Sequence, residues 1–249
     1  MIPNFTIGNL TIDCANAERT RSFYADLFGY EKTVAYGCPA VKADRDLTIL
    51  FAETDVAYLP PVWPEEQGEQ QKQMHLDFTV VNLTSAVEKA VSLGAAKAAA
   101  QYGGDGFITL LDTEGHPFCL CKGTEPDISI NVDCQKQKSL CAFYAGLAGW
   151  DQYLHYSGTL VADNGMIVCF QGCDNDATMD EYIPPVWPEQ DGKQQKQMHF
   201  NFQVDDLQST VEEAISLGAR KPAQQYGGGH FVTLLDTAGH PFCLCARNK

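Results

Sequence analysis

Three observations predict an α+β protein with two tandem domains. The second half of the chain repeats the first, each repeat orders its expected elements as β-α-β-β-β twice, and a linker-like segment separates the repeats. A repeat of about 120 residues is a whole domain, because solenoid repeats span only about 20–50 residues. We therefore predict domains at residues 1–123 and 124–249, with Gly123–Asp127 (GTEPD) at their boundary.

The duplication is clearest in two long segments. Residues 58–121 open with YLPPVWPEEQGEQQKQMHLDFTV and close with FITLLDTEGHPFCLC, and residues 182–245 open with YIPPVWPEQDGKQQKQMHFNFQV and close with FVTLLDTAGHPFCLC. These segments align without a gap. The earlier parts, IDCANAERTRSFYADLFGY and VDCQKQKSLCAFYAGLAGW, align more weakly. A register change of about four residues between the two regions indicates a short insertion near QGCDND.

The first module of each repeat begins with a strand and a helix. Alternation over Thr6–Cys14 predicts the strand, and apolar residues at helical spacing predict a helix over Asn16–Phe28. Gly29 is placed to cap the end of this helix. Three short strands are expected near Glu31–Tyr36, Ala40–Ala43 and Leu47–Glu53.

The second module follows a Pro-rich loop that contains Trp63. The expected elements are a strand at Gln73–Val80, a helix at Leu83–Leu93 with Gly94 after it, and strands near Lys97–Tyr102, Gly106–Asp112 and Phe118–Cys121. Each module leaves one face of its sheet without a helix of its own. Two modules can therefore curl into a shared curved mixed sheet with the helices outside.

Composition narrows the class of partner. The formal net charge of -15 disfavours nucleic acid and anionic membrane surfaces as partners.

The N-terminus lacks the basic and apolar regions of a signal peptide, and no run is long enough for a membrane span. The ten Cys form no C-x-x-C pair and are interpreted as reduced thiols in a cytoplasmic protein.

Three motifs carry a family resemblance: FYADLFGYE at the end of the first helix, MHLDFTV at the start of the second module, and LLDTEGHPFCL at its close. Together with the module order, they resemble the vicinal oxygen chelate (VOC) superfamily of glyoxalase, bleomycin-resistance and dioxygenase-like proteins. The resemblance covers nearly the whole chain twice and implies two tandem glyoxalase-like domains. It does not specify an activity, because one fold hosts many functions.

The resemblance also implies where a metal would bind. Members that use a metal place His, Gln or Glu ligands on the first strand of each module and a Glu on a last strand. Carried onto this chain, these positions are Asn9, His75 and Cys119 in one set, and Ser129, His199 and Cys243 in the other. Only the His remains in each set, so we expect no cofactor. A divalent metal is the alternative, with an incomplete ligand set that has His75 or His199 as its donor.

Strand alternation predicts which side chains line a polar pocket for a small-molecule ligand. The expected ligand-binding residues are Asn9, Thr11, Gln73, Asp77, Ser129, Asn131, Gln197 and Asn201, with His75 and His199 as acid/base catalysts if the protein is an enzyme. Asp77 would orient His75, whereas Asn201 stands at its place in the second repeat. Asp13 and Asp133 are alternative bases or helix N-caps.

Other motifs have two readings each. Cys119 and Cys243 are either nucleophiles in the pocket or small buried strand residues. Trp63 and Trp187, in identical PPVWP loops, either close over the ligand or pack against the other repeat.

The turn motif D-T-x-G-H-P has one preferred reading. Its residues His116 and His240 are interpreted as turn residues, because Gly and Pro fix the backbone on either side of them.

Three function hypotheses follow. The first is a metal-independent VOC protein that sequesters a drug or metabolite, as bleomycin-resistance proteins do. The second is a glyoxalase-like lyase or isomerase that acts on a small carbonyl compound. The third leaves one repeat functional and the other structural, with Asp77 favouring the first repeat. Such domains pair as dimers, so the tandem chain is expected to form an intramolecular pseudo-dimer, with further homo-oligomerisation left open.

Overall fold

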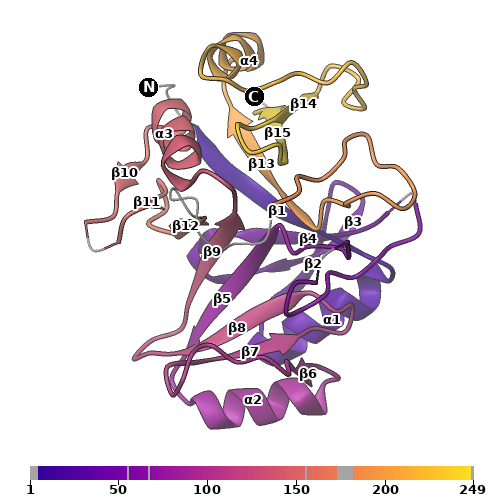
Figure 1. Cartoon of the computed structure of the whole chain (residues 1–249), viewed down its shortest axis with the longest axis vertical. Helices are drawn as coiled ribbons and strands as arrows, with labels where there is room; N and C mark the ends of the chain where they lie inside the picture. The colour runs from indigo at the N-terminus through magenta and orange to yellow at the C-terminus, as the bar shows by residue number, and fades with distance from the viewer. Residues whose placement is uncertain (1–4, 55, 67, 155, 173–181, 248–249) are drawn as a thin grey trace.

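The computed structural model describes residues 5–54, 56–66, 68–154, 156–172 and 182–247, which form two mixed sheets and their helices (Figure 1). The seven-stranded sheet has the order β14 (Phe231–Leu235), β15 (Pro241–Ala246), β13 (Met198–Val204), β1 (Thr6–Cys14), β4 (Thr48–Glu53), β3 (Cys38–Lys42) and β2 (Glu31–Ala35). The eight-stranded sheet has the order β10 (Asp151–Gln152), β11 (Thr159–Val161), β12 (Ile167–Gln171), β9 (Asp127–Asp133), β5 (Met74–Val80), β8 (Pro117–Lys122), β7 (Phe107–Leu111) and β6 (Ala96–Lys97). The helices are α1 (Ala17–Phe28), the short 3-10 helix η1 (Asp44–Asp46), α2 (Leu83–Ser92), α3 (Gln137–Ala148) and α4 (Leu207–Ser216).

The two modules that share a sheet come from different repeats. β1 of the first repeat pairs antiparallel with β13 of the second, and β5 of the first pairs antiparallel with β9 of the second. The connection between β8 and β9 covers only residues 123–126, so β9 must lie next to the second module of the first repeat. The α+β class with paired modules is confirmed, and the structure adds that the pairing crosses between the repeats.

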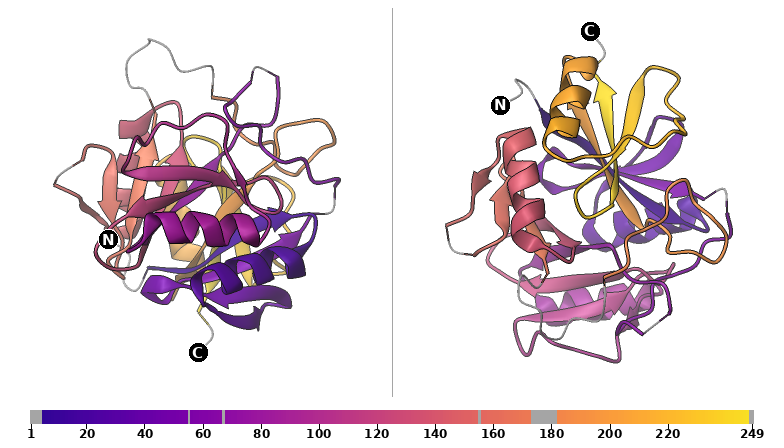
Figure 2. Two further views of the ribbon diagram at one scale, coloured as in Figure 1. Left: turned by 90° about the horizontal axis from the view of Figure 1, so that it is seen from below. Right: turned by 45° about the horizontal axis from the view of Figure 1, so that its top comes forward.

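Helix α1 forms where the sequence predicts it. Asn16 caps its N-terminus by accepting a hydrogen bond from the Arg19 amide, and Gly29 ends it with φ of 76°. Glycine adopts this left-handed backbone conformation at little cost, because it carries no Cβ. Helices α1 and α2 lie side by side on the outside of the molecule (Figure 2, left).

Each repeat has its own aromatic cluster under its helices. In the first repeat the Tyr24 ring lies 5.6 Å from Phe51 of the seven-stranded sheet and 5.9 Å from Phe78 of the eight-stranded sheet. Tyr144 takes the same position in the second repeat, 5.3 Å from Phe170 and 6.1 Å from Phe200. The aromatic cluster of each repeat therefore packs against both sheets. Each sheet, in turn, contains strands from both repeats.

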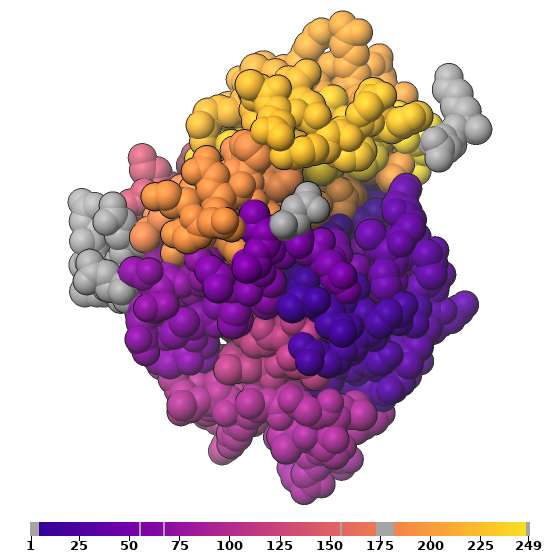
Figure 3. Space-filling view, turned by 90° about the vertical axis from the view of Figure 1, so that its right-hand side faces the viewer, coloured from indigo at the N-terminus to yellow at the C-terminus, as the bar shows by residue number. Residues whose placement is uncertain are grey.

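The two Pro-rich loops meet between the repeats (Figure 3). Gln195 accepts a hydrogen bond from the Leu59 amide at 2.9 Å and donates one to the Ala57 carbonyl at 2.7 Å. Gln71 makes the matching contact with the Ile183 amide at 2.9 Å. The QQKQ sequence, which is the same in both repeats, thus makes reciprocal contacts between them.

Two local expectations need comment. The strand predicted at Lys97–Tyr102 is reduced to β6, because the Gln101 side chain bonds to both backbone groups of Thr109 in place of a strand ladder. The insertion predicted near QGCDND falls largely on residues 173–181, which lie outside the described residues. No helix in the described part of the chain has the length and apolar character to cross a membrane.

Candidate functional site

The crossed pairing changes how the predicted site residues are grouped. Thr11 pairs with His199 and Asn9 with Asn201 across β1 and β13, and Cys243 pairs with Asn201. The sets expected from the resemblance, Asn9/His75/Cys119 and Ser129/His199/Cys243, are therefore wrong in their first member. The structure brings together Asn9, His199 and Cys243 in the seven-stranded sheet, and Ser129, His75 and Cys119 in the eight-stranded sheet.

A cavity of about 390 Å³ opens on the polar face of the seven-stranded sheet. It is lined by Asp13, Ala52, Glu53, Thr54, Val56, Trp187, Glu189, Lys196, His199, Asn201, Tyr226, Phe231, Thr233, Pro241 and Cys243. A second cavity of about 390 Å³, which contains Asn9, Thr11, Tyr36 and His230, shares Asn201 and Phe231 with the first. The two cavities adjoin, so together they form one groove across the sheet.

A buried lysine that sequence reasoning missed lies in this groove. Lys196 pairs with Asp13 and lies 3.0 Å from Glu189, and its ammonium is 5.3 Å from the centre of the Trp187 ring. Burial raises the pKa of Asp13 to about 6, because this effect outweighs the lowering by Lys196. Burial alone would lower the pKa of Lys196, but the charges of Asp13 and Glu189 raise it. The helix-capping reading of Asp13 is wrong, since Asn16 caps α1.

The eight-stranded sheet repeats this arrangement. Lys72 pairs with Asp133, lies 3.4 Å from Glu65, and is 5.1 Å from the centre of the Trp63 ring. Asp133 likewise caps no helix, because Lys136 stands at the N-terminus of α3. The sequence does carry a signal for these lysines. In both repeats a Lys stands three residues before the His of the MH pair, just ahead of a strand.

Of the two site histidines, His75 is buried and His199 is half-buried. Burial holds the pKa of His199 well below its usual range, and the Lys196 charge lowers it further. His75 has the same shift from burial and from Lys72. The Nδ1 atom of each ring is buried without a hydrogen-bond partner in the described structure. A neutral imidazole of this kind can accept a proton or a hydrogen bond from a bound ligand.

The donor set in the seven-stranded sheet does not fit a divalent metal. The Asn201 amide nitrogen donates to the Asn9 oxygen at 2.6 Å and to the Thr11 hydroxyl at 2.9 Å. The amide oxygen of Asn9 is thus engaged, and no carboxylate stands among Asn9, His199, Asn201 and Cys243 to balance the charge of the ion.

The matching place in the eight-stranded sheet has a larger side chain at one position and a carboxylate at another. Gln171 stands where Ala52 stands in the other sheet, and its amide donates to Asn131 at 2.8 Å. Asp77 replaces Asn201, and its Oδ1 lies 3.5 Å from His75 Nε2. Burial raises the pKa of Asp77 and raises that of Cys119 to about 12.

The remaining predicted residues have these positions. Gln73 and Gln197 are fully buried and donate weakly, at 3.4 Å, to the carbonyls of Ile183 and Leu59 in the opposite repeat. Trp187 lines the groove and contacts Tyr226 at 5.7 Å. Trp63 contacts Tyr102 of its own repeat at 5.7 Å.

The thiols and the turn histidines have simple local partners. Cys119 and Cys243 are buried, each 3.5 Å from the hydroxyl of a neighbouring strand threonine. His116 lies in the turn before β8, where its Nδ1 is 3.2 Å from Asp112. His240 takes the same position beside Asp236 at 3.0 Å. The described cysteines are all free thiols.

Comparisons with known proteins agree with this architecture. The family model for a glyoxalase-like domain matches residues 9–121 and 129–245. A search of the curated proteins found no match. Glyoxalase I from Zea mays is similar in structure, with a TM-score of 0.62 at 11% identity over 97% of this chain and 92% of that one. A protein described as a putative dioxygenase from Bacillus subtilis subsp. subtilis str. 168 has a TM-score of 0.60 at 10% identity, over 100% of this chain and 87% of that one.

At such identities the structural neighbours show the fold alone. The family match, by contrast, covers both repeats almost from end to end. The chain therefore belongs to the glyoxalase-like domain family of the VOC superfamily, with two tandem copies of the domain.

Proposed function

We propose that this protein binds a small organic molecule in the groove of the seven-stranded sheet without the help of a divalent metal. The observation that carries the proposal is the groove itself. An aromatic wall of Trp187, Tyr226 and Phe231 borders a cavity of about 390 Å³. Ligand sites are typically apolar clefts with a few polar groups that fix the orientation of the ligand.

Buried polar atoms support the same proposal. Trp187 Nε1 and His199 Nδ1 are buried without a hydrogen-bond partner in the described structure. Buried polar groups of this kind are costly to leave unpaired. A ligand with a hydroxyl, amine or carbonyl group would satisfy them.

The charge of the cavity favours a cationic or neutral ligand. Three carboxylates, Asp13, Glu53 and Glu189, line it against one ammonium, that of Lys196. The chain as a whole carries a net charge of -15. A positively charged aromatic compound would gain both from this field and from stacking on the aromatic wall.

An enzymatic role for the same groove is the second candidate. His199 lines the cavity as a neutral imidazole, which can remove a proton from a carbonyl compound. The two functions differ in the fate of the ligand. Sequestration returns the compound unchanged, whereas catalysis yields a product and is lost in His199→Gln.

The test uses Trp187 as the reporter of binding. The W63F/W150F variant retains Trp187 as its tryptophan, and a cationic acridine dye such as proflavine serves as the probe. We expect saturable quenching of Trp187 fluorescence, with the dye recovered unchanged. E189Q and Y226A should each weaken binding about tenfold, because each removes one favourable contact of about 1.4 kcal/mol.

Matched controls come from the first repeat. E65Q and Y102A change the equivalent positions at the eight-stranded sheet and should leave the Trp187 titration unaltered. Quenching that is linear in dye concentration, or equal losses in both pairs of variants, would show that the dye does not bind in the groove.

A further inference from the structure

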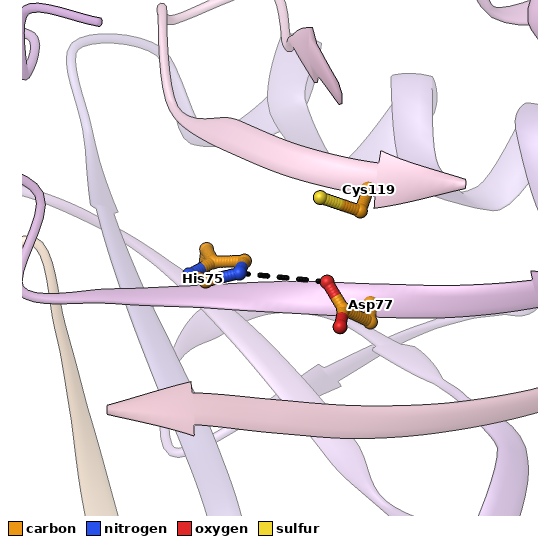
Figure 4. Close-up of side chains that lie close together, drawn as sticks. All are labelled: His75, Asp77 and Cys119. Carbon is orange, nitrogen blue, oxygen red and sulfur yellow. Dashed lines mark ion pairs between the residues drawn. The ribbon is translucent and has the colours of Figure 1, made fainter. Parts of the chain in front are cut away.

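Three metal-binding side chains converge in the eight-stranded sheet (Figure 4). His75, Asp77 and Cys119 each offer a ligand atom, and these atoms all lie within 4.8 Å of one another. The register of β5 and β8 sets Asp77 directly beside Cys119. His75 and Asp77 share one face of β5 because they are two residues apart.

The spacing of the donors suits a tetrahedral ion. With zinc bonds of about 2.0 Å to nitrogen or oxygen and about 2.3 Å to sulfur, neighbouring donor atoms lie about 3.3–3.6 Å apart. His75 Nε2 and Asp77 Oδ1 are 3.5 Å apart. The remaining separations are within 4.8 Å, so binding of the ion would require side-chain rotations that bring the sulfur closer.

Two of the three donor side chains also carry buried polar atoms without a partner in the described structure. Asp77 Oδ1 is buried with no hydrogen-bond partner in the described structure, and so is His75 Nδ1 on a ring that is only 8% exposed. The nearby Lys72 ammonium would repel a cation, but it is already paired with Asp133 and Glu65. The cluster therefore offers a buried carboxylate oxygen and an imidazole ring to an ion.

We propose that His75, Asp77 and Cys119 form a zinc site that exists in only one half of the molecule. On binding, the Cys119 thiol releases its proton to solvent as the zinc–sulfur bond forms. The thiolate and the Asp77 carboxylate then balance the two positive charges of the ion. A mixed nitrogen, oxygen and sulfur set of this kind suits Zn²⁺ better than a hard ion such as Mg²⁺.

The second repeat supplies a natural negative control. There the same positions hold His199, Asn201 and Cys243, which differ by a single residue. Asn201 donates its amide protons to Asn9 and Thr11, so it has no anionic oxygen to offer. One substitution in each repeat should thus move the site between the two sheets.

The experiment is metal titration of the full chain under reducing conditions. Elemental analysis after zinc loading and desalting should give one zinc per chain. Co²⁺, which takes the same tetrahedral sites, should produce a thiolate-to-cobalt charge-transfer band in the near ultraviolet. D77N should weaken zinc binding at least about tenfold, C119S should abolish the band, and C243S should leave both readouts unchanged.

The reverse substitution completes the design. N201D should raise the stoichiometry to two zinc ions per chain and double the cobalt band. D77N copies a residue that the second repeat already accommodates, so loss of folding is not expected, and circular dichroism checks this. No retained zinc in the wild-type chain, or a cobalt band that persists in C119S, would overturn the proposal. Because the ligand groove lies in the other sheet, dye binding and zinc binding can fail independently.

Discussion

His116 shows how one side chain can fix the Pro-rich loop to the core. Its ring lies between two partners, with Nδ1 3.2 Å from Asp112 and Nε2 2.9 Å from the Tyr58 hydroxyl at the start of the loop. Asp112 also accepts a hydrogen bond from Tyr24 of α1 at 2.9 Å. Asp112 and His116 together therefore connect a turn, a helix and a loop, and the sequence motif D-T-E-G-H-P predicts only the turn.

This arrangement predicts a pH-dependent contribution to stability. Burial alone would lower the pKa of His116, but the Asp112 charge outweighs it and raises that pKa above its usual value. The folded state thus binds the proton more tightly than the unfolded state. The contribution is fully present below about pH 6.5 and is lost as the pH rises through the raised pKa of the folded state.

We therefore expect His116→Gln to destabilise the protein more at about pH 6 than at about pH 9, by about 1–3 kcal/mol at the lower pH. Urea unfolding at the two values measures this. Tyr58→Phe is the control, because it removes a contact of the ring without removing the titrating group, and its cost should vary less between the two values than that of H116Q. An H116Q cost that does not vary with pH would show that His116 is not ionised.

The site residues were predictable only in part, for a physical reason. Alternation places His75 and Asp77 on one face of a strand, and this is local information. That Asp77 stands beside Cys119 depends on the register between β5 and β8, which no local pattern encodes. The same holds for Lys196, whose partner Asp13 lies in the other repeat. The ligand-binding and acid/base roles of the predicted residues stay predictions.

At the scale of the helix, the two repeats differ in how they begin an equivalent element. Helix α1 starts after Asn16, whose side chain accepts from the Arg19 amide, while α3 starts after Lys136 with no side-chain cap. The backbone conformations agree, with φ of -143° and -123° at the two positions. Lys136 is exposed, so a shorter side chain there disturbs no packing.

Lys136→Asn should therefore stabilise the protein by about 0.5–1 kcal/mol, because it supplies the missing hydrogen-bond acceptor for the first turn. Asn16→Ala should cost about the same amount at the other helix. Thermal unfolding of both variants and the wild type tests the pair. If K136N lowers the melting temperature, the second repeat does not use the cap geometry of the first.

Helices and central strands could be predicted because their signals are local. The cap Asn16, the terminating Gly29 and the apolar spacing between them suffice to define α1. The strand expected over Lys97–Tyr102 failed, because the Gln101 side chain replaces a backbone ladder there. A side chain that substitutes for backbone pairing leaves no periodic trace in the sequence.

For the whole molecule, sequence similarity between the repeats hides which modules pair. The strands β5 and β13 share four of their seven residues and the same alternation, so β1 could in principle pair with either. The short connection from β8 to β9 decides the matter, because it holds β9 against β5 and leaves β1 to pair with β13. Each repeat thus offers two unpaired edges that the other repeat covers.

An isolated first repeat, residues 1–123, should consequently not be stable as a monomer. Without the second repeat, the edges of β1 and β5 are exposed, and exposed strand edges drive association. Because β5 is equivalent to β13 and shares four of its seven residues, two copies of the fragment can pair β1 of each with β5 of the other and rebuild two joined sheets. We expect a twofold dimer by size-exclusion chromatography with light scattering. A folded monomer at micromolar concentration would mean that the helices and the aromatic cluster of one repeat suffice, and that the crossed sheets contribute little to stability.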